Sequence, residues 1–60
     1  MKLITRFEAA SRSTTELHAL RTQAMRAFAS AARGSENRRK ALASLEAIEA
    51  ELVVRPNGLL

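Results

Sequence analysis

The chain has 60 residues, of which 47% are hydrophobic, and a formal net charge of +4 from ten Lys and Arg against six Asp and Glu. A chain of this length forms one domain and buries only about 60% of its unfolded surface, so a monomer is marginally stable. The absence of cysteine excludes disulfides and cysteine-ligated zinc, and the single histidine cannot hold a metal ion by itself. We therefore expect one domain over residues 1–60, with residues 55–60 as a short tail, stabilised by oligomerisation and without a cofactor or metal.

A first helix is predicted over about residues 2–33, because apolar residues recur there at alternating spacings of four and three. This spacing is typical of a coiled-coil seam, and only Thr14 and Arg21 interrupt it with polar side chains. Residues 11–15 are weak helix formers, however, and Ser13 with Glu16 has the spacing of a capping box, so a new helix could begin at Ser13. The unbroken phase of the repeat favours one continuous helix, and a break near residues 11–13 is the alternative.

A second helix is predicted over about residues 36–54, after a tight turn at Gly34 and Ser35. Glycine adopts the positive φ that ends a helix, and serine caps the helix that follows. Arg55 is held extended by Pro56, so the second helix ends there.

Antiparallel pairing of the two helices about this turn sets their register. Arg21 then lies beside Glu49, and we expect an ion pair between them, with a solvent-exposed Arg21 as the alternative. Large residues meet small ones, as a dense core requires. Three facing pairs follow from the turn: Phe28 with Ala41, Ala24 with Leu45, and Leu17 with Leu52.

The predicted fold class is all-α, a two-helix antiparallel hairpin that dimerises into a four-helix bundle. The apolar stripe of the first helix is too wide for one partner helix. The second helix is also too short to cover Leu3, Ile4 and Phe7, unless Leu59 and Leu60 fold back onto them. A second hairpin would solve both problems. The predicted assembly residues are Leu3, Phe7, Leu17, Leu20, Arg21, Met25, Phe28, Leu42, Leu45, Ile48, Glu49 and Leu52.

The sequence gives almost no support for an enzyme. It has no glycine-rich phosphate loop and no G-x-S-x-G or H-E-x-x-H motif. Glu46 and Glu49 lie one turn apart but on a helix face that we expect to face solvent, without an apolar pocket. His18 has no second metal-ligand side chain one turn away and is interpreted as a boundary residue.

The short length of the apolar segments bears on where the protein is located. The longest apolar run, residues 52–54, is far shorter than the roughly 20 residues of a membrane span. Charged residues interrupt the start of the chain before a signal-peptide core can form. The first 33 residues have the Arg, Ser and Thr content of a mitochondrial presequence, but Glu8 and Glu16 argue against one. We expect a cytoplasmic protein.

Basic residues carry the only functional signal. Nine of the ten cations lie in residues 1–40, against three carboxylates. Arg12, Arg26 and Arg33 are spaced in multiples of seven, so one continuous helix would place them in a line on its outer face. Arg38, Arg39 and Lys40 follow the turn, where they oppose the dipole of the second helix.

We expect a non-enzymatic small regulatory or accessory protein that acts by helical self-association and docking on a partner protein. In an antiparallel homodimer, the basic turn of one chain would lie beside Glu46, Glu49 and Glu51 of the other. The alternative is a nucleic-acid-binding module that contacts phosphates without sequence readout. A second alternative is an amphipathic first helix on a membrane surface, which its alanine-rich face without Trp disfavours. The predicted partner or polyanion contacts are Arg12, Arg26, Arg33, Arg38, Arg39 and Lys40.

Overall fold

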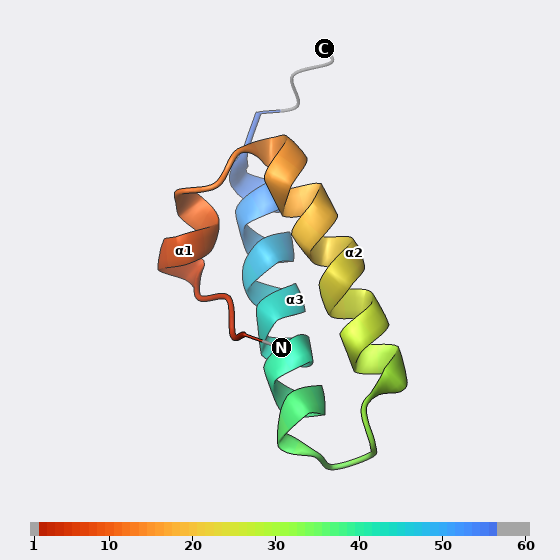
Figure 1. Cartoon of the computed structure of the whole chain (residues 1–60). Helices are drawn as coiled ribbons and strands as arrows, with labels where there is room; N and C mark the ends of the chain where they lie inside the picture. Colours follow the sequence, from red (N-terminus) through yellow and green to blue (C-terminus); the bar gives the residue numbers. More distant parts are fainter. Residues whose placement is uncertain (1, 57–60) are drawn as a thin grey trace.

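The computed structural model describes residues 2–56, which form three α-helices and no strand. These are α1 (Arg6–Ala10), α2 (Thr14–Ser30) and α3 (Glu36–Val54). Figure 1 shows α2 and α3 side by side and antiparallel, joined by the turn, while the short α1 lies against α3. The all-α class and the packing of two long helices are therefore confirmed, whereas the expected dimerisation into a four-helix bundle is not tested by the structure of a single chain.

The continuous first helix is wrong, and the alternative that begins a new helix at Ser13 is correct. The Ser13 hydroxyl accepts a bond from the Glu16 backbone N–H (3.0 Å), and the Glu16 carboxylate accepts one from the Ser13 N–H (2.9 Å). The bond from the Ser13 backbone lowers the pKa of Glu16. This capping box satisfies two backbone donors locally, whereas a long straight helix needs a partner along its whole length.

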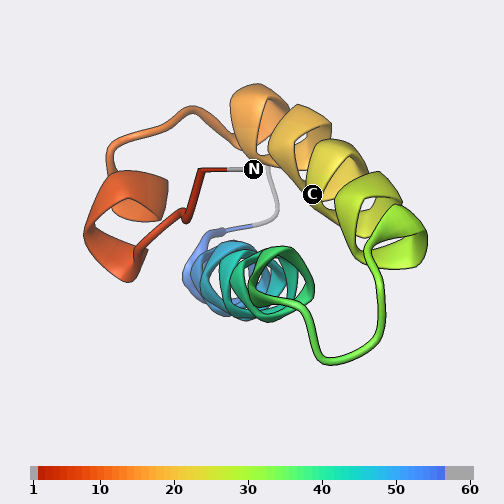
Figure 2. The ribbon, with the colours of Figure 1, turned by 60° about the horizontal axis from the view of Figure 1, so that its bottom comes forward.

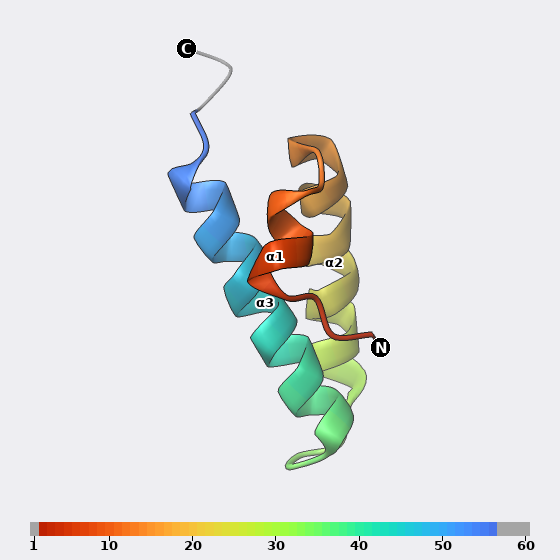
Figure 3. The same ribbon diagram turned by 90° about the vertical axis from the view of Figure 1, so that its left-hand side faces the viewer.

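α1 and the residues before it fold back over one side of the α2–α3 pair (Figures 2 and 3). Thr5 begins α1, because its hydroxyl accepts a hydrogen bond from the Glu8 backbone N–H (3.1 Å). Ile4 is only 6% exposed, and its N–H donates to the Oγ of Ser44 on α3 (2.9 Å). The start of the chain is therefore fixed to α3 by a hydrogen bond inside the protein.

The prediction that Leu3, Ile4 and Phe7 all remain uncovered by the second helix is partly wrong. Ile4 and Ala9 are buried against α3, whereas Phe7 is 86% exposed and Leu3 is also exposed. The fold thus uses a different face of this segment from the one that the apolar repeat indicated, because the break lets α1 turn independently of α2. The proposed cover by Leu59 and Leu60 lies outside the described residues.

The core is small and lies where all three helices meet. Leu17 and Ile48 are fully buried at its centre, and Ile4 and Ala9 complete the cluster from the α1 side. Leu20 and Leu52 pack against it from α2 and α3. Four residues of the predicted assembly set, Leu17, Leu20, Ile48 and Leu52, therefore belong to the core of a single chain.

The turn and the register agree with the sequence-based predictions. Gly34 has a φ of +71°, and the Ser35 hydroxyl accepts a hydrogen bond from the Arg38 backbone N–H (3.1 Å) at the start of α3. The predicted ion pair is present, with the Nε of Arg21 2.8 Å from a Glu49 carboxylate oxygen. This pair ties the middle of α2 to α3.

Arg55 has a structural role that the sequence did not reveal. Its guanidinium donates to the Glu51 carboxylate (3.0 Å) and to the Thr14 hydroxyl (3.1 Å). It also donates to the backbone carbonyls of Ala9 (3.1 Å) and Arg12 (2.6 Å). The last carbonyls of a helix lack partners within that helix. Arg55 was predicted only as the beginning of a tail. Its hydrogen bonds attach the end of α1 and the linker before α2 to the end of α3.

Candidate partner-binding face

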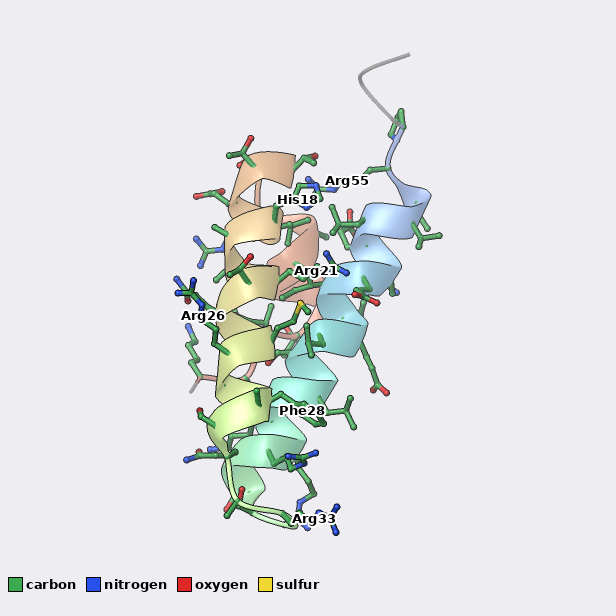
Figure 4. All side chains as sticks on the ribbon, turned by 90° about the vertical axis from the view of Figure 1, so that its right-hand side faces the viewer. His18, Arg21, Arg26, Phe28, Arg33 and Arg55 are labelled. Atoms are coloured by element: carbon green, nitrogen blue, oxygen red, sulfur yellow. The ribbon has the colours of Figure 1, made fainter. Side chains whose placement is uncertain are left out.

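One face of the α2–α3 pair is not covered by α1. On α2 it carries Arg21, Met25 and Phe28, which are spaced by four and three residues and so lie in one stripe. On α3 it carries Arg38, Leu42, Leu45 and Glu49, which follow the same rule. We call these two stripes the open face. Figure 4 looks onto it, with Arg21 and Phe28 between the two helices and α1 behind them.

Polar contacts hold the two stripes together, and apolar side chains lie between these contacts. The Arg21–Glu49 ion pair joins the stripes near the middle of α2. Toward the turn, the guanidinium of Arg38 lies over the Phe28 ring, 4.0 Å from its centroid. Met25 and Leu42 remain 49% and 46% exposed. The open face therefore presents exposed apolar side chains on two neighbouring helices, between charged ones.

The open face ends at the turn in a hollow of about 230 Å³. Phe28 and Leu42 form its apolar walls, and Arg38 and Arg39 lie at its edge. Gly34 and Ser35 complete the lining from the turn. We call this cavity the turn-end hollow.

The C-terminal end of α2 positions the side chain of Arg38. Its Nη1 donates to the carbonyl oxygen of Phe28 (3.2 Å), one of the last four carbonyls of α2 that have no partner in that helix. A cation is favourable at this negative end of the helix dipole. This explains why a cation is tolerated in the first turn of α3, since its charge lies near the C-terminus of α2.

The other predicted contact cations differ in how they are neutralised. Arg33 and Arg39 are exposed at the turn, and among residues 2–56 neither forms an ion pair. Lys40 lies 4.0 Å from Glu36, the only carboxylate near the turn. Figure 4 shows Arg33 at the turn and Arg26 pointing away from α3. Among residues 2–56, Arg33, Arg38 and Arg39 thus have no carboxylate partner near the turn-end hollow, and of these Arg33 and Arg39 are exposed.

The predicted line of arginines does not form, because it required one continuous helix. Arg12 lies in the linker between α1 and α2, 3.8 Å from Glu8, and Arg33 lies in the turn after α2. Only Arg26 is on α2. The proposed membrane-surface helix loses its basis for the same reason, since Leu3 precedes α1 and Phe7 is on α1, separate from Leu17 and Phe28 on α2.

The acidic residues that the homodimer hypothesis needs are largely engaged within the chain. Glu49 pairs with Arg21. Glu51 is 13% exposed and pairs with Arg6 (3.6 Å) and Arg55 (3.0 Å). Among the described residues, Glu46 alone of the three forms no ion pair. The charge complementarity expected between two copies is therefore much reduced.

The structure divides the predicted site residues between separate regions. Four of the predicted residues, Leu17, Leu20, Ile48 and Leu52, belong to the core. Seven others lie on the open face: Arg21, Met25, Phe28, Arg38, Leu42, Leu45 and Glu49. Leu3 and Phe7 are exposed on the side that carries α1. Ser44 and Arg55 have structural roles that the sequence patterns did not indicate. For Ser44, the available signal was a serine within an apolar stripe.

His18, Glu46 and Glu49 were the residues considered for chemistry in the sequence. His18 and Glu46 are exposed. Within residues 2–56, no three side chains of the metal-ligating types come together. In that same range, no helix combines the length and the apolar character needed to cross a bilayer.

The fold and the open face define a small three-helix protein with an apolar surface that ends in a basic turn. Comparison with protein-family models, with curated proteins and with solved structures gave no match. The proposals below rest on the residues of this chain.

Proposed function

We propose that this chain is a non-enzymatic interaction protein that docks on a partner protein through the open face. The observation that carries the proposal is the half exposure of Met25 and Leu42 beside Phe28 and Leu45, in two parallel stripes. Apolar side chains on two neighbouring helices can pack against the apolar side of a third helix. The contacts of Arg21 with Glu49 and of Arg38 with Phe28 hold the two stripes of the open face in place without a partner.

A second copy of the chain is the other possible occupant, and it would give the four-helix bundle expected from the sequence. A core with only two large buried apolar side chains at its centre gives a reason for such an assembly. The charges favour a different protein, however. A second copy brings another +4 charge, while Glu49 and Glu51 are already paired within their own chain.

The proposal is tested by comparing what the tagged chain binds in the cells that produce it. We expect the variant Met25→Ser with Leu42→Ser to lose a defined set of proteins that the unchanged chain retains. The matched control is Gln23→Ser with Ala43→Ser, because both residues are exposed on the same helices but outside the open face. Equal recovery with both double variants would contradict the proposal.

Self-association is measured separately by light scattering of the purified chain. We expect a monomer at micromolar concentration. A dimer that the Met25→Ser and Leu42→Ser variant dissociates would assign the open face to a second copy and would overturn docking on a different protein.

A nucleic-acid-binding module is the second candidate, favoured by the exposed and unpaired Arg33 and Arg39. Duplex DNA and structured RNA are titrated at two salt concentrations. Micromolar binding that weakens steeply with salt would support this candidate, and no binding at low salt would eliminate it.

A further inference from the structure

We infer that the turn-end hollow binds an acidic protein segment that carries one large apolar side chain. The apolar side chain enters the hollow between Phe28 and Leu42, and carboxylates on either side of it pair with Arg33 and Arg39. This inference rests on the proposed function and specifies the chemistry of the partner at one end of the open face.

The size and lining of the hollow fit a side chain. Its volume of about 230 Å³ is below the range of roughly 300–1,000 Å³ that is typical of small-molecule sites. Phe28 and Leu42 supply apolar walls, and Met25 extends the apolar surface along α2. A single large apolar residue of a docked segment would enter the hollow, and its neighbours would lie along the open face.

The charge around the hollow selects for carboxylates. Arg33 and Arg39 have no ion-pair partner among residues 2–56, and Glu36 is engaged with Lys40 at 4.0 Å. Arg38 stays over Phe28 and closes one side of the hollow.

Three features favour an acidic protein segment over a nucleic acid. One face of the Phe28 ring is covered by the Arg38 guanidinium and is not free to stack on a base. Arg26 points away from α3, and Arg12 is near Glu8. Arg33 and Arg39 thus lie near the turn and apart from Arg26, and these cations do not form a line along a phosphate backbone.

Peptide titration followed by fluorescence anisotropy tests this inference. The probe is a short peptide with one Leu flanked by glutamates, beside a version with Gln for every Glu and a version with Ala for the Leu. We expect binding in the micromolar range for the first peptide, and binding weaker by about tenfold or more for each of the others.

Variants of the chain locate the binding. We expect Arg33→Ala with Arg39→Ala to weaken binding of the acidic peptide by about tenfold, and Arg26→Ala, a cation outside the hollow, to leave it unchanged. Leu42→Ala reduces the preference for Leu over Ala in the peptide. Circular dichroism confirms that each variant is folded.

Several results would overturn the inference. These are the absence of binding by the acidic peptide, equal binding of the Gln version, equal binding of the Ala version, or an equal effect of Arg26→Ala. Tighter binding of duplex DNA or RNA that depends on Arg33 and Arg39 would assign the cations to phosphates. If the peptide fails but the open-face variant still loses cellular partners, only this inference fails. If the peptide binds but no cellular partner depends on the open face, the proposed function fails.

Discussion

The two ends of the α2–α3 pair both carry arginines, but their arginines are used differently. At the end next to α1, Arg55 is only 18% exposed and donates to a carboxylate, a hydroxyl and several backbone carbonyls. At the turn end, Arg38 bonds to one carbonyl, and Arg33 and Arg39 are exposed without ion pairs among residues 2–56. An arginine stabilises the fold where it meets unpaired carbonyls and carboxylates, and elsewhere its charge is available to another molecule.

The largest effect is expected from breaking the contacts of Arg55. Arg55→Ala removes a guanidinium donor from the Ala9 and Arg12 carbonyls and one partner of the partly buried Glu51, so we expect the free energy of unfolding to fall by about 2 kcal/mol. Urea denaturation measures it, and Arg26→Ala is the control because Arg26 is exposed and points away from α3. Equal effects of the two variants would contradict the role given to Arg55.

Ser44 tests how firmly the start of the chain is fixed on α3. Ser44→Ala leaves the N–H of the buried Ile4 without an acceptor, and we expect a loss of about 1–2 kcal/mol in the free energy of unfolding. Ser30→Ala is the matched control, since the Ser30 hydroxyl is exposed and its 3.4 Å bond to the Ala27 carbonyl is long. Amide hydrogen exchange of Ile4 adds a local readout. Unchanged protection of this amide in Ser44→Ala would show that the hydrogen bond is unimportant.

Arg38→Ala sharpens the comparison between the two ends. Arg38 makes one carbonyl hydrogen bond and one contact with an aromatic ring, fewer contacts than Arg55 makes. We expect a loss of about 1 kcal/mol in the free energy of unfolding, roughly half of that for Arg55→Ala. Arg38→Lys should lose most of the same contribution, because an ammonium group does not stack on the ring as a guanidinium does. A loss as large as that of Arg55→Ala would show that arginines stabilise the fold equally at both ends.

The smallest effect is expected for the exposed pair Arg21–Glu49. Its side chains are 42% and 52% exposed, so a double-mutant cycle of Arg21→Ala and Glu49→Ala should give a coupling of about 0.5 kcal/mol. Added salt should reduce this coupling. Arg21→Leu should leave stability unchanged or raise it. A coupling above about 2 kcal/mol would mean that the pair, and not the core, determines the register of the helices.

Features that depend on local chemistry could be predicted from the sequence. Gly34 and Ser35 fixed the turn, and α3 begins and ends where its caps and Pro56 indicated. Arg21 and Glu49 meet because the position of the turn determines which residues face each other. The capping box at Ser13 is also visible in the sequence, and this local motif determines where α2 begins, whereas the seven-residue repeat incorrectly predicts one continuous helix.

Features that depend on contacts between distant segments could not be predicted. Because the chain breaks after α1, Ile4 and Ala9 are buried, whereas Leu3 and Phe7 are exposed. No repeat in the sequence indicates which of these residues face the core. The Ala9 carbonyl lies within reach of Arg55 because α1 packs against α3, a contact between segments far apart in the sequence. Met25 and Leu42 were expected beside the seam, but the turn-end hollow depends on where the Arg38 side chain lies.

Unfolding of the variant Arg33→Ala with Arg39→Ala tests the central claim most directly, namely that the arginines of the turn end are not needed for the fold. We expect its free energy of unfolding to stay within about 0.5 kcal/mol of the unchanged chain, because no carboxylate among residues 2–56 pairs with either side chain. Arg55→Ala, measured beside it in the same urea titration, should lose about 2 kcal/mol. A comparable loss in both variants would contradict this claim, because Arg33 and Arg39 would then contribute as much to the free energy of unfolding as Arg55 does.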